Sequence, residues 1–197
     1  MMRRLRLDRS GASAAEFAMV LPLLILFIFG IIDAGRYLWE VNKAEKATQA
    51  GARVAVVTNV LDTGLRDENY VGQTIGGVTL TQGDVIPASA LALVECTVAG
   101  CNPASGTFDT YTFNEIIVKR MQFMKPDIDP GDVTVSYRGS GLGFAGDPNG
   151  MDIAPLVTVE LDNVMFRPIV LFGAAEFELP AFRTTLTAED SEGSQSN

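Results

Sequence analysis

The sequence predicts an α+β protein: a long N-terminal helix, transmembrane in its first half, packs on a small antiparallel sheet head that carries a second helix. Three observations predict this fold. Residues 12–32 are an almost unbroken apolar run, residues 33–60 continue with helical spacing, and short segments within residues 61–188 alternate apolar and polar residues. A period of two is typical of half-buried strands, whereas spacings of three and four indicate a helix.

Residues 1–11 form a short basic segment in front of the apolar run. They contain four arginines, Arg3, Arg4, Arg6 and Arg9. About 20 apolar residues span a bilayer core as a helix, so residues 12–32 are long enough to cross a membrane. A secretory signal peptide has a shorter apolar region followed by small residues, whereas here the small residues come first. Because basic flanks stay in the cytoplasm, we expect the chain after Asp33 to lie across the membrane.

Glu16 is the one acid in the apolar run, and two interpretations of it stay open. In a plain signal-anchor, the carboxylate reaches the headgroups and meets the positive end of the helix dipole. Alternatively, the chain is cut after Gly11, so that Ala12 becomes the first residue and Glu16 the fifth. The new ammonium of a neighbouring subunit then neutralises Glu16 inside a dry bundle, because a buried charge persists only when it is paired.

This arrangement resembles type IV prepilins, and within them most closely the TadE-like pseudopilins of tight-adherence (Tad/Flp) pilus systems. The matching residues are Arg9-Ser10-Gly11, Ala12-Ser13-Ala14-Ala15-Glu16-Phe17, Leu21-Pro22-Leu23-Leu24 and Asp33-Ala34-Gly35-Arg36. Ala12 is a departure from many type IV pilins, which carry Phe or Met at the first mature position, and it favours the Tad branch. The likeness extends loosely to residues 132–188.

The resemblance implies a minor pilin-like subunit that helps to assemble or prime a Tad/Flp pilus. It implies a processing site at Gly11 and Ala12, and a role in assembly for Glu16 and Phe17. The implied partners are a prepilin peptidase, the major Flp-type pilin, other pseudopilins, inner-membrane platform proteins and membrane lipid. The implied location is the bacterial inner membrane, with a single pass, a cytoplasmic N-terminus and a periplasmic head that can also enter the extracellular pilus.

Residues 33–60 predict a continuation of the helix beyond the membrane, with an end near Thr58. One face carries Tyr37, Val41, Ala44, Thr48, Gly51, Ala52 and Ala55 at helical spacing. The small residues on this face permit close approach of a neighbour. Packing against the protein's own sheet is favoured over contact between subunits.

The head, residues 61–188, predicts a strand at Gly77–Thr81 and a helix at Thr112–Lys125. Thr112 and Glu115 match a capping box, and Pro126 stops the helix. Further strands are predicted at Val133–Tyr137, Leu156–Asp162, and Leu179 or Phe182 to Ala188, with a short helix at Phe166–Ala175. Residues 189–197 are polar and predict a disordered tail.

Composition narrows the functional classes. The net charge is −9, which makes nucleic acid an unexpected partner, and the chain has no histidine, the commonest general base and metal ligand. No nucleophile motif or phosphate-binding loop is present, so we expect a protein that is not an enzyme and that has no catalytic, cofactor-binding or metal site. The acidic stretches at 127–132 and 147–152 have turn chemistry that accounts for them without calcium.

Cys96 and Cys101 predict a disulfide, because the topology places them in an oxidising compartment. The alternative is two reduced, unlinked cysteines; zinc is not expected, since two thiols without histidine do not complete four ligands.

Two other functional classes remain open for the whole chain. One is a signal-anchored periplasmic binding or sensor domain that is not assembled into a pilus, and the weaker one is an enzyme with an unrecognised site. Sequencing of the mature N-terminus separates the pilin-like subunit from the plain anchor.

Overall fold

The computed structural model describes residues 10–148, 150–168 and 176–188, with the side chains of the first helix described from residue 13. The chain divides into two compact units. The first comprises Met1–Val41 and Met165–Phe177, and the second comprises Asn42–Val164 and Glu178–Asn197. The predicted α+β class is confirmed, since a long apolar helix is followed by a small antiparallel sheet and a short helix.

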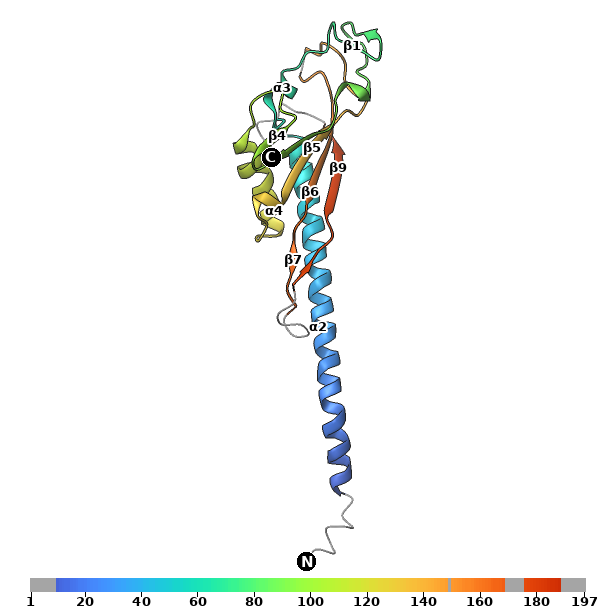
Figure 1. Cartoon of the computed structure of the whole chain (residues 1–197), viewed down its shortest axis with the longest axis vertical. Coiled ribbons are helices and arrows are strands. Elements are labelled where there is room, and N and C mark those ends of the chain that lie inside the picture. The colour runs from blue at the N-terminus through green and yellow to red at the C-terminus, as the bar shows by residue number, and fades with distance from the viewer. Residues whose placement is uncertain (1–9, 149, 169–175, 189–197) are drawn as a thin grey trace, which may run out of the picture. The chain divides into compact units, whose positions relative to one another are not determined.

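The first helix, α2, runs without a break from Ser10 to Ala55 (Figure 1). It ends earlier than the expected position near Thr58. The Val57 amide bonds to the Val54 carbonyl, three residues back, and the Thr58 hydroxyl donates to the same carbonyl at 3.0 Å. These bonds tighten the last turn, and a hydroxyl that bonds to nearby backbone carbonyls competes with continuation of the helix.

The main sheet has five antiparallel strands in the order β4-β3-β5-β6-β9. Their bounds are β3 Val94–Thr97, β4 Gly100–Asn102, β5 Val133–Arg138, β6 Leu156–Leu161 and β9 Phe182–Thr187. The last three agree with the predicted strands to within one residue at each end, and β9 starts at Phe182, the later of the two predicted starts. The hairpin β3–β4 was not predicted. It joins the sheet by pairing Val94 with Tyr137 and Cys96 with Val135.

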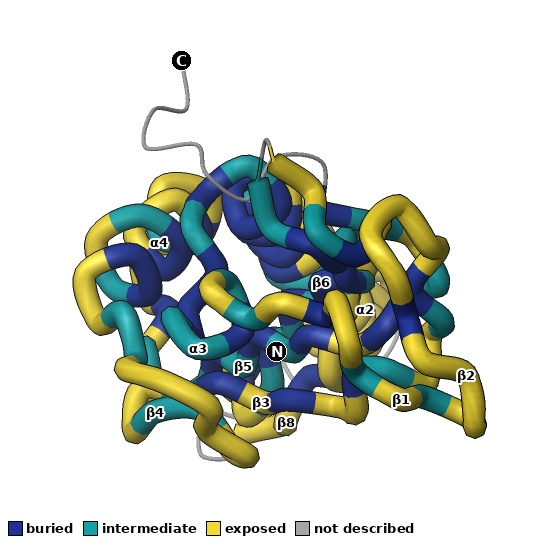
Figure 2. Tube along the Cα trace, turned by 90° about the horizontal axis from the view of Figure 1, so that it is seen from above, coloured by how far each residue is buried: buried dark blue, intermediate teal, exposed yellow. Residues whose placement is uncertain are grey.

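The core of the second unit lies between this sheet and two helices. Alternate residues of β5 and β6 are buried, as the period of two requires. Gly51 of α2 faces them: a Cβ built on Gly51 would lie 2.8 Å from Met121 Cγ and 3.3 Å from Val159 Cγ1. The small residues of this face therefore pack against the protein's own head. In contrast to this buried core, the hairpin of β1 (Thr74–Ile75) and β2 (Val78–Thr79) is largely exposed, as Figure 2 shows.

The second helix begins differently from the prediction. Asp109, not Thr112, caps it, because the Asp109 carboxylate accepts bonds from the Thr112 amide and hydroxyl at 2.9 and 2.8 Å. Glu115 pairs instead with Lys119, one turn on, at 2.9 Å. A π-helical segment, η2 (Thr112–Val118), leads into α4 (Lys119–Met124). The predicted capping box is therefore wrong.

Short elements complete the described fold. They are α3 (Thr63–Arg66), β1 (Thr74–Ile75), β2 (Val78–Thr79), η1 (Ala88–Ala90), η3 (Pro130–Asp132), β7 (Met165–Phe166) and β8 (Phe177–Glu178). The predicted strand Gly77–Thr81 corresponds to β2 and its flanks.

The predicted helix Phe166–Ala175 is wrong at its start, because Phe166 belongs to strand β7. Arg167 stands before Pro168, a position that disfavours helical backbone angles. In addition, the Leu179 amide donates to the Val164 carbonyl at 2.7 Å, which draws the two flanks together as a hairpin. Residues 169–175 and the predicted tail 189–197 lie outside the described residues.

Candidate functional site

The N-terminal half of α2 is an apolar surface that nothing in the described chain covers. Its most apolar 18-residue window has a mean hydropathy of 2.5, and none of that window is buried. Phe17, Val20 and Phe27 are 63%, 59% and 64% exposed. Large side chains on a contiguous surface of this kind require hydrocarbon or a partner helix, because water solvates them poorly. The helix is long and apolar enough to cross a membrane.

The predicted assembly residues, Glu16 and Phe17, both lie exposed on this part of α2. Glu16 forms no ion pair with any residue in the described ranges. Gly11 and Ala12, the predicted processing site, lie in the first turn of α2. The geometry therefore places Glu16 just over one helical turn after Gly11, on a surface that is free to meet another molecule.

A compact cluster at residues 33–37 of α2 lies beyond the apolar run, in the first unit. Asp33 is 5% exposed, and its carboxylate lies 3.5 Å from Arg36 Nη1. The Arg36 guanidinium also donates to the Arg167 carbonyl at 3.4 Å and lies 5.6 Å from the centre of the Phe166 ring. Tyr37 meets the same ring edge-on, with 5.4 Å between centroids. The sequence did not reveal this cluster, because strand β7 lies about 130 residues after residues 33–37 in the chain.

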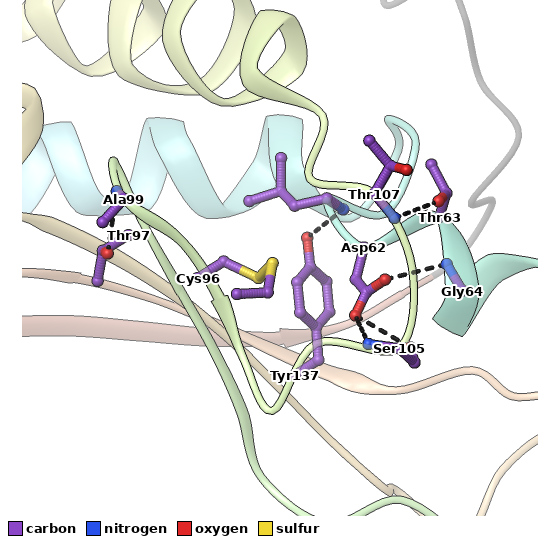
Figure 3. Close-up of a disulfide and its surroundings, with 11 residues drawn as sticks. Asp62, Thr63, Gly64, Cys96, Thr97, Ala99, Ser105, Thr107 and Tyr137 are labelled. Atoms are coloured by element: carbon purple, nitrogen blue, oxygen red, sulfur yellow. Dashed lines mark hydrogen bonds between the residues drawn. A yellow bond between two sulfur atoms is a disulfide. The ribbon is translucent and has the colours of Figure 1, made fainter.

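Cys96 and Cys101 are joined by a disulfide across the hairpin β3–β4, where the register sets them opposite each other. Figure 3 draws this bridge together with Tyr137 and Asp62. The Tyr137 hydroxyl accepts a bond from the Leu61 amide at 3.1 Å, and burial raises the pKa of Tyr137. Asp62 accepts bonds from the Gly64 amide and from the amide and hydroxyl of Ser105. These contacts fix the chain where it leaves α2.

The two acidic stretches hold loops in shape. Asp152 accepts bonds from the amides of Tyr70, Gly146 and Asp147 at 2.9 to 3.0 Å. Asp129 accepts one from the Gly131 amide. Among the residues that the structure describes, no three acidic, cysteine or histidine side chains group as a metal site. The Asp129 contact is that of a helix cap, whereas Asp152 ties together loops that are distant in sequence.

The geometry thus defines a class: a protein with one N-terminal apolar helix, as in a single-pass membrane anchor, joined to an α+β head. A family model described as TadE-like protein matches residues 11–53, so this helix is similar to that of TadE-like proteins. The match lies entirely within α2 and includes both Gly11 and Glu16. No curated protein and no solved structure matches the chain.

Proposed function

We propose that this protein is a minor pilin-like subunit, a pseudopilin, that helps to assemble or prime a Tad/Flp-type pilus. One observation carries the proposal: the TadE-like match includes an apolar N-terminal half of α2 whose surface has no cover in the described chain. A helix of this kind can be held in a bilayer first and then packed among the helices of other subunits. The TadE-like family supports involvement with Tad pilus machinery in general.

In this proposal, a prepilin peptidase cuts the precursor after Gly11 and leaves Ala12 with a free ammonium. Glu16 then becomes the fifth residue of the mature chain. Its carboxylate accepts the ammonium of a neighbouring subunit, and the exposed Phe17 ring packs beside it. The pairing matters because an unpaired carboxylate in a dry helix bundle is strongly disfavoured.

The proposed location is the bacterial inner membrane, with the N-terminus in the cytoplasm and the head in the periplasm. The four leader arginines support this orientation. The proposed partners are the peptidase, the major Flp-type pilin, sister pseudopilins and the platform proteins. The protein's role is structural rather than catalytic: it is the substrate of the peptidase and carries no chemistry of its own.

The test is the mass of the mature protein extracted from membranes of cells that make the cognate peptidase. We expect Ala12 at the N-terminus. Gly11→Leu should accumulate as uncut precursor, because a bulky side chain at the cut hinders entry of the backbone into a membrane protease. Gly35→Leu is the matched control, since a Cβ at Gly35 meets nothing within 4 Å. A dominant intact N-terminus in the unsubstituted protein would favour the anchored periplasmic domain instead.

A further inference from the structure

A groove of about 300 Å³ lies on the second unit between α2 and α4. Its rim carries three exposed cations, Lys46 and Arg53 from α2 and Arg120 from α4. Its apolar lining, called its floor, consists of Val54, which is buried, and Met124, which is 36% exposed. We call this surface the basic groove.

The charges of the basic groove are unusual for this protein. The whole chain has a net charge of −9, yet no carboxylate lines the groove. Lys46, Arg53 and Arg120 form no ion pair with any residue in the described part of the chain, whereas the nearby Lys119 is paired with Glu115. Three unpaired cations that converge on one recess repel each other and favour a ligand of opposite charge.

The apolar floor continues beyond the rim. A second hollow of about 330 Å³ shares Val54 and Arg120 with the groove and is also lined by Ile116, Phe123 and the ion-paired Glu115 and Lys119. The Phe123 side chain is 78% exposed. An exposed aromatic ring in the same hollow as the unpaired Arg120 is typical of an interface centre, since aromatic residues and Arg dominate binding energy in protein contacts.

The spacing of the cations is compatible with a helical ligand. Lys46 and Arg53 are separated by two helical turns, which correspond to about 10.5 Å along the axis. A partner helix that carries carboxylates at the same spacing, with apolar residues between them, matches the charges and the floor together. An anionic membrane surface supplies charge without an apolar side chain positioned to fill the recess. Nucleic acid is disfavoured by the negative charge of the rest of the protein.

We propose that the basic groove is a docking site for an acidic amphipathic segment of another protein chain. Carboxylates of that segment pair with Arg53 and with Arg120 or Lys46, and its apolar residues lie against Val54, Met124 and Phe123. This inference goes beyond the proposed function and does not depend on it, because the groove belongs to the second unit and needs neither cleavage nor Glu16.

The experiment uses the full-length protein in a neutral detergent. The probe is a labelled, acetylated helical peptide with two glutamates two turns apart and leucines between them; glutamine replaces both glutamates in the control peptide. We expect the glutamate peptide to bind at least tenfold more tightly, and R53E or R120E to weaken it about tenfold, which corresponds to about 1.4 kcal/mol. Binding should also weaken as salt is raised.

The control variant is R138E, which makes the same charge change at an exposed arginine of β5 outside the groove. It should leave the affinity unchanged. R53Q and R120Q, checked by circular dichroism, provide milder substitutions should a charge reversal disturb folding. Equal binding of both peptides, or equal loss with R138E, would overturn the proposal. So would peptide affinity that is unaffected by R53E while binding to phosphatidylglycerol vesicles is lost.

Discussion

The two halves of α2 share one backbone and meet different surroundings. In residues 13–32 most side chains are large and apolar and almost all are exposed, with Phe17, Leu23 and Phe27 above 60%. In residues 42–55 the inward face is built from small residues, and Ala44, Ala47 and Ala52 are completely buried. The difference teaches that the small residues of the second half pack against this chain's own head. The apolar side chains of the first half have no packing partner in the described chain.

Polar groups show the same contrast. In the second unit, Asp62 is 1% exposed, and its carboxylate accepts three hydrogen bonds. Glu16, in the first half of α2, has no ion-pair partner among the described residues. A carboxylate that is held in place inside its own fold contributes to stability. A carboxylate that is exposed on an apolar helix does not stabilise this fold, and we expect it to interact with another molecule.

The largest expected effect comes from a glycine of the second half. Gly51→Leu should lower the free energy of unfolding of the head by about 3 kcal/mol, because the new side chain must displace Met121 and Val159 from a closed interface. Urea unfolding of the full-length protein in neutral detergent, followed by near-ultraviolet circular dichroism, measures the change.

Gly35→Leu is the matched control on the same helix. A Cβ there has nothing within 4 Å, so the head should keep its stability, and the helix should gain up to about 1 kcal/mol from loss of a glycine. Equal destabilisation by the two substitutions would remove the distinction between the halves of α2.

A smaller effect is expected from two buried tyrosines of the second unit. Tyr137→Phe removes the acceptor of the Leu61 amide and should cost about 1.5 kcal/mol. The Tyr70 hydroxyl is buried and has no hydrogen-bond partner in the described part of the chain, and burial raises the pKa of Tyr70 to about 12. Tyr70→Phe should therefore be neutral or stabilise by up to about 1 kcal/mol. The same unfolding measurement applies. Destabilisation by Tyr70→Phe, or none by Tyr137→Phe, would refute this assignment of the two hydroxyls.

Elements whose signal is local were predicted from the sequence. The apolar run fixes the first half of α2 by its length, and alternation identifies β5, β6 and β9. The hairpin β3–β4 was missed because its strands are short and are held by pairing with β5, far along the chain. The apolar run at Phe166 was misassigned, because a short apolar run does not distinguish a strand from a helix.

The candidate sites likewise divide into those that local sequence spacing predicts and those that depend on the tertiary fold. Glu16 was singled out because its distance from Gly11 is a property of the sequence alone. The cap at Asp109 was missed because Thr112 and Glu115 matched a local pattern that the fold uses differently. The basic groove was invisible in the sequence, since Arg53 and Arg120 come together only when α4 packs beside α2.

The central claim, that the first half of α2 serves assembly, is tested most directly at Glu16. Glu16→Ala and Glu16→Gln should be inserted, cleaved after Gly11 and folded in the head like the unsubstituted protein. A carboxylate costs about 2–3 kcal/mol to hold in a bilayer, so its loss does not hinder insertion. Glu45→Ala, at an exposed glutamate in the second half of the same helix, is the matched control.

The measurement is site-specific crosslinking to partner pilins, with a count of pili, in cells that make each variant. We predict that both Glu16 variants lose the crosslinks and the pili, because a neighbour's ammonium then has no carboxylate to meet in the bundle, while Glu45→Ala keeps both. Normal cleavage, normal crosslinks and wild-type pili in Glu16→Ala would contradict the account and leave α2 as a membrane anchor alone.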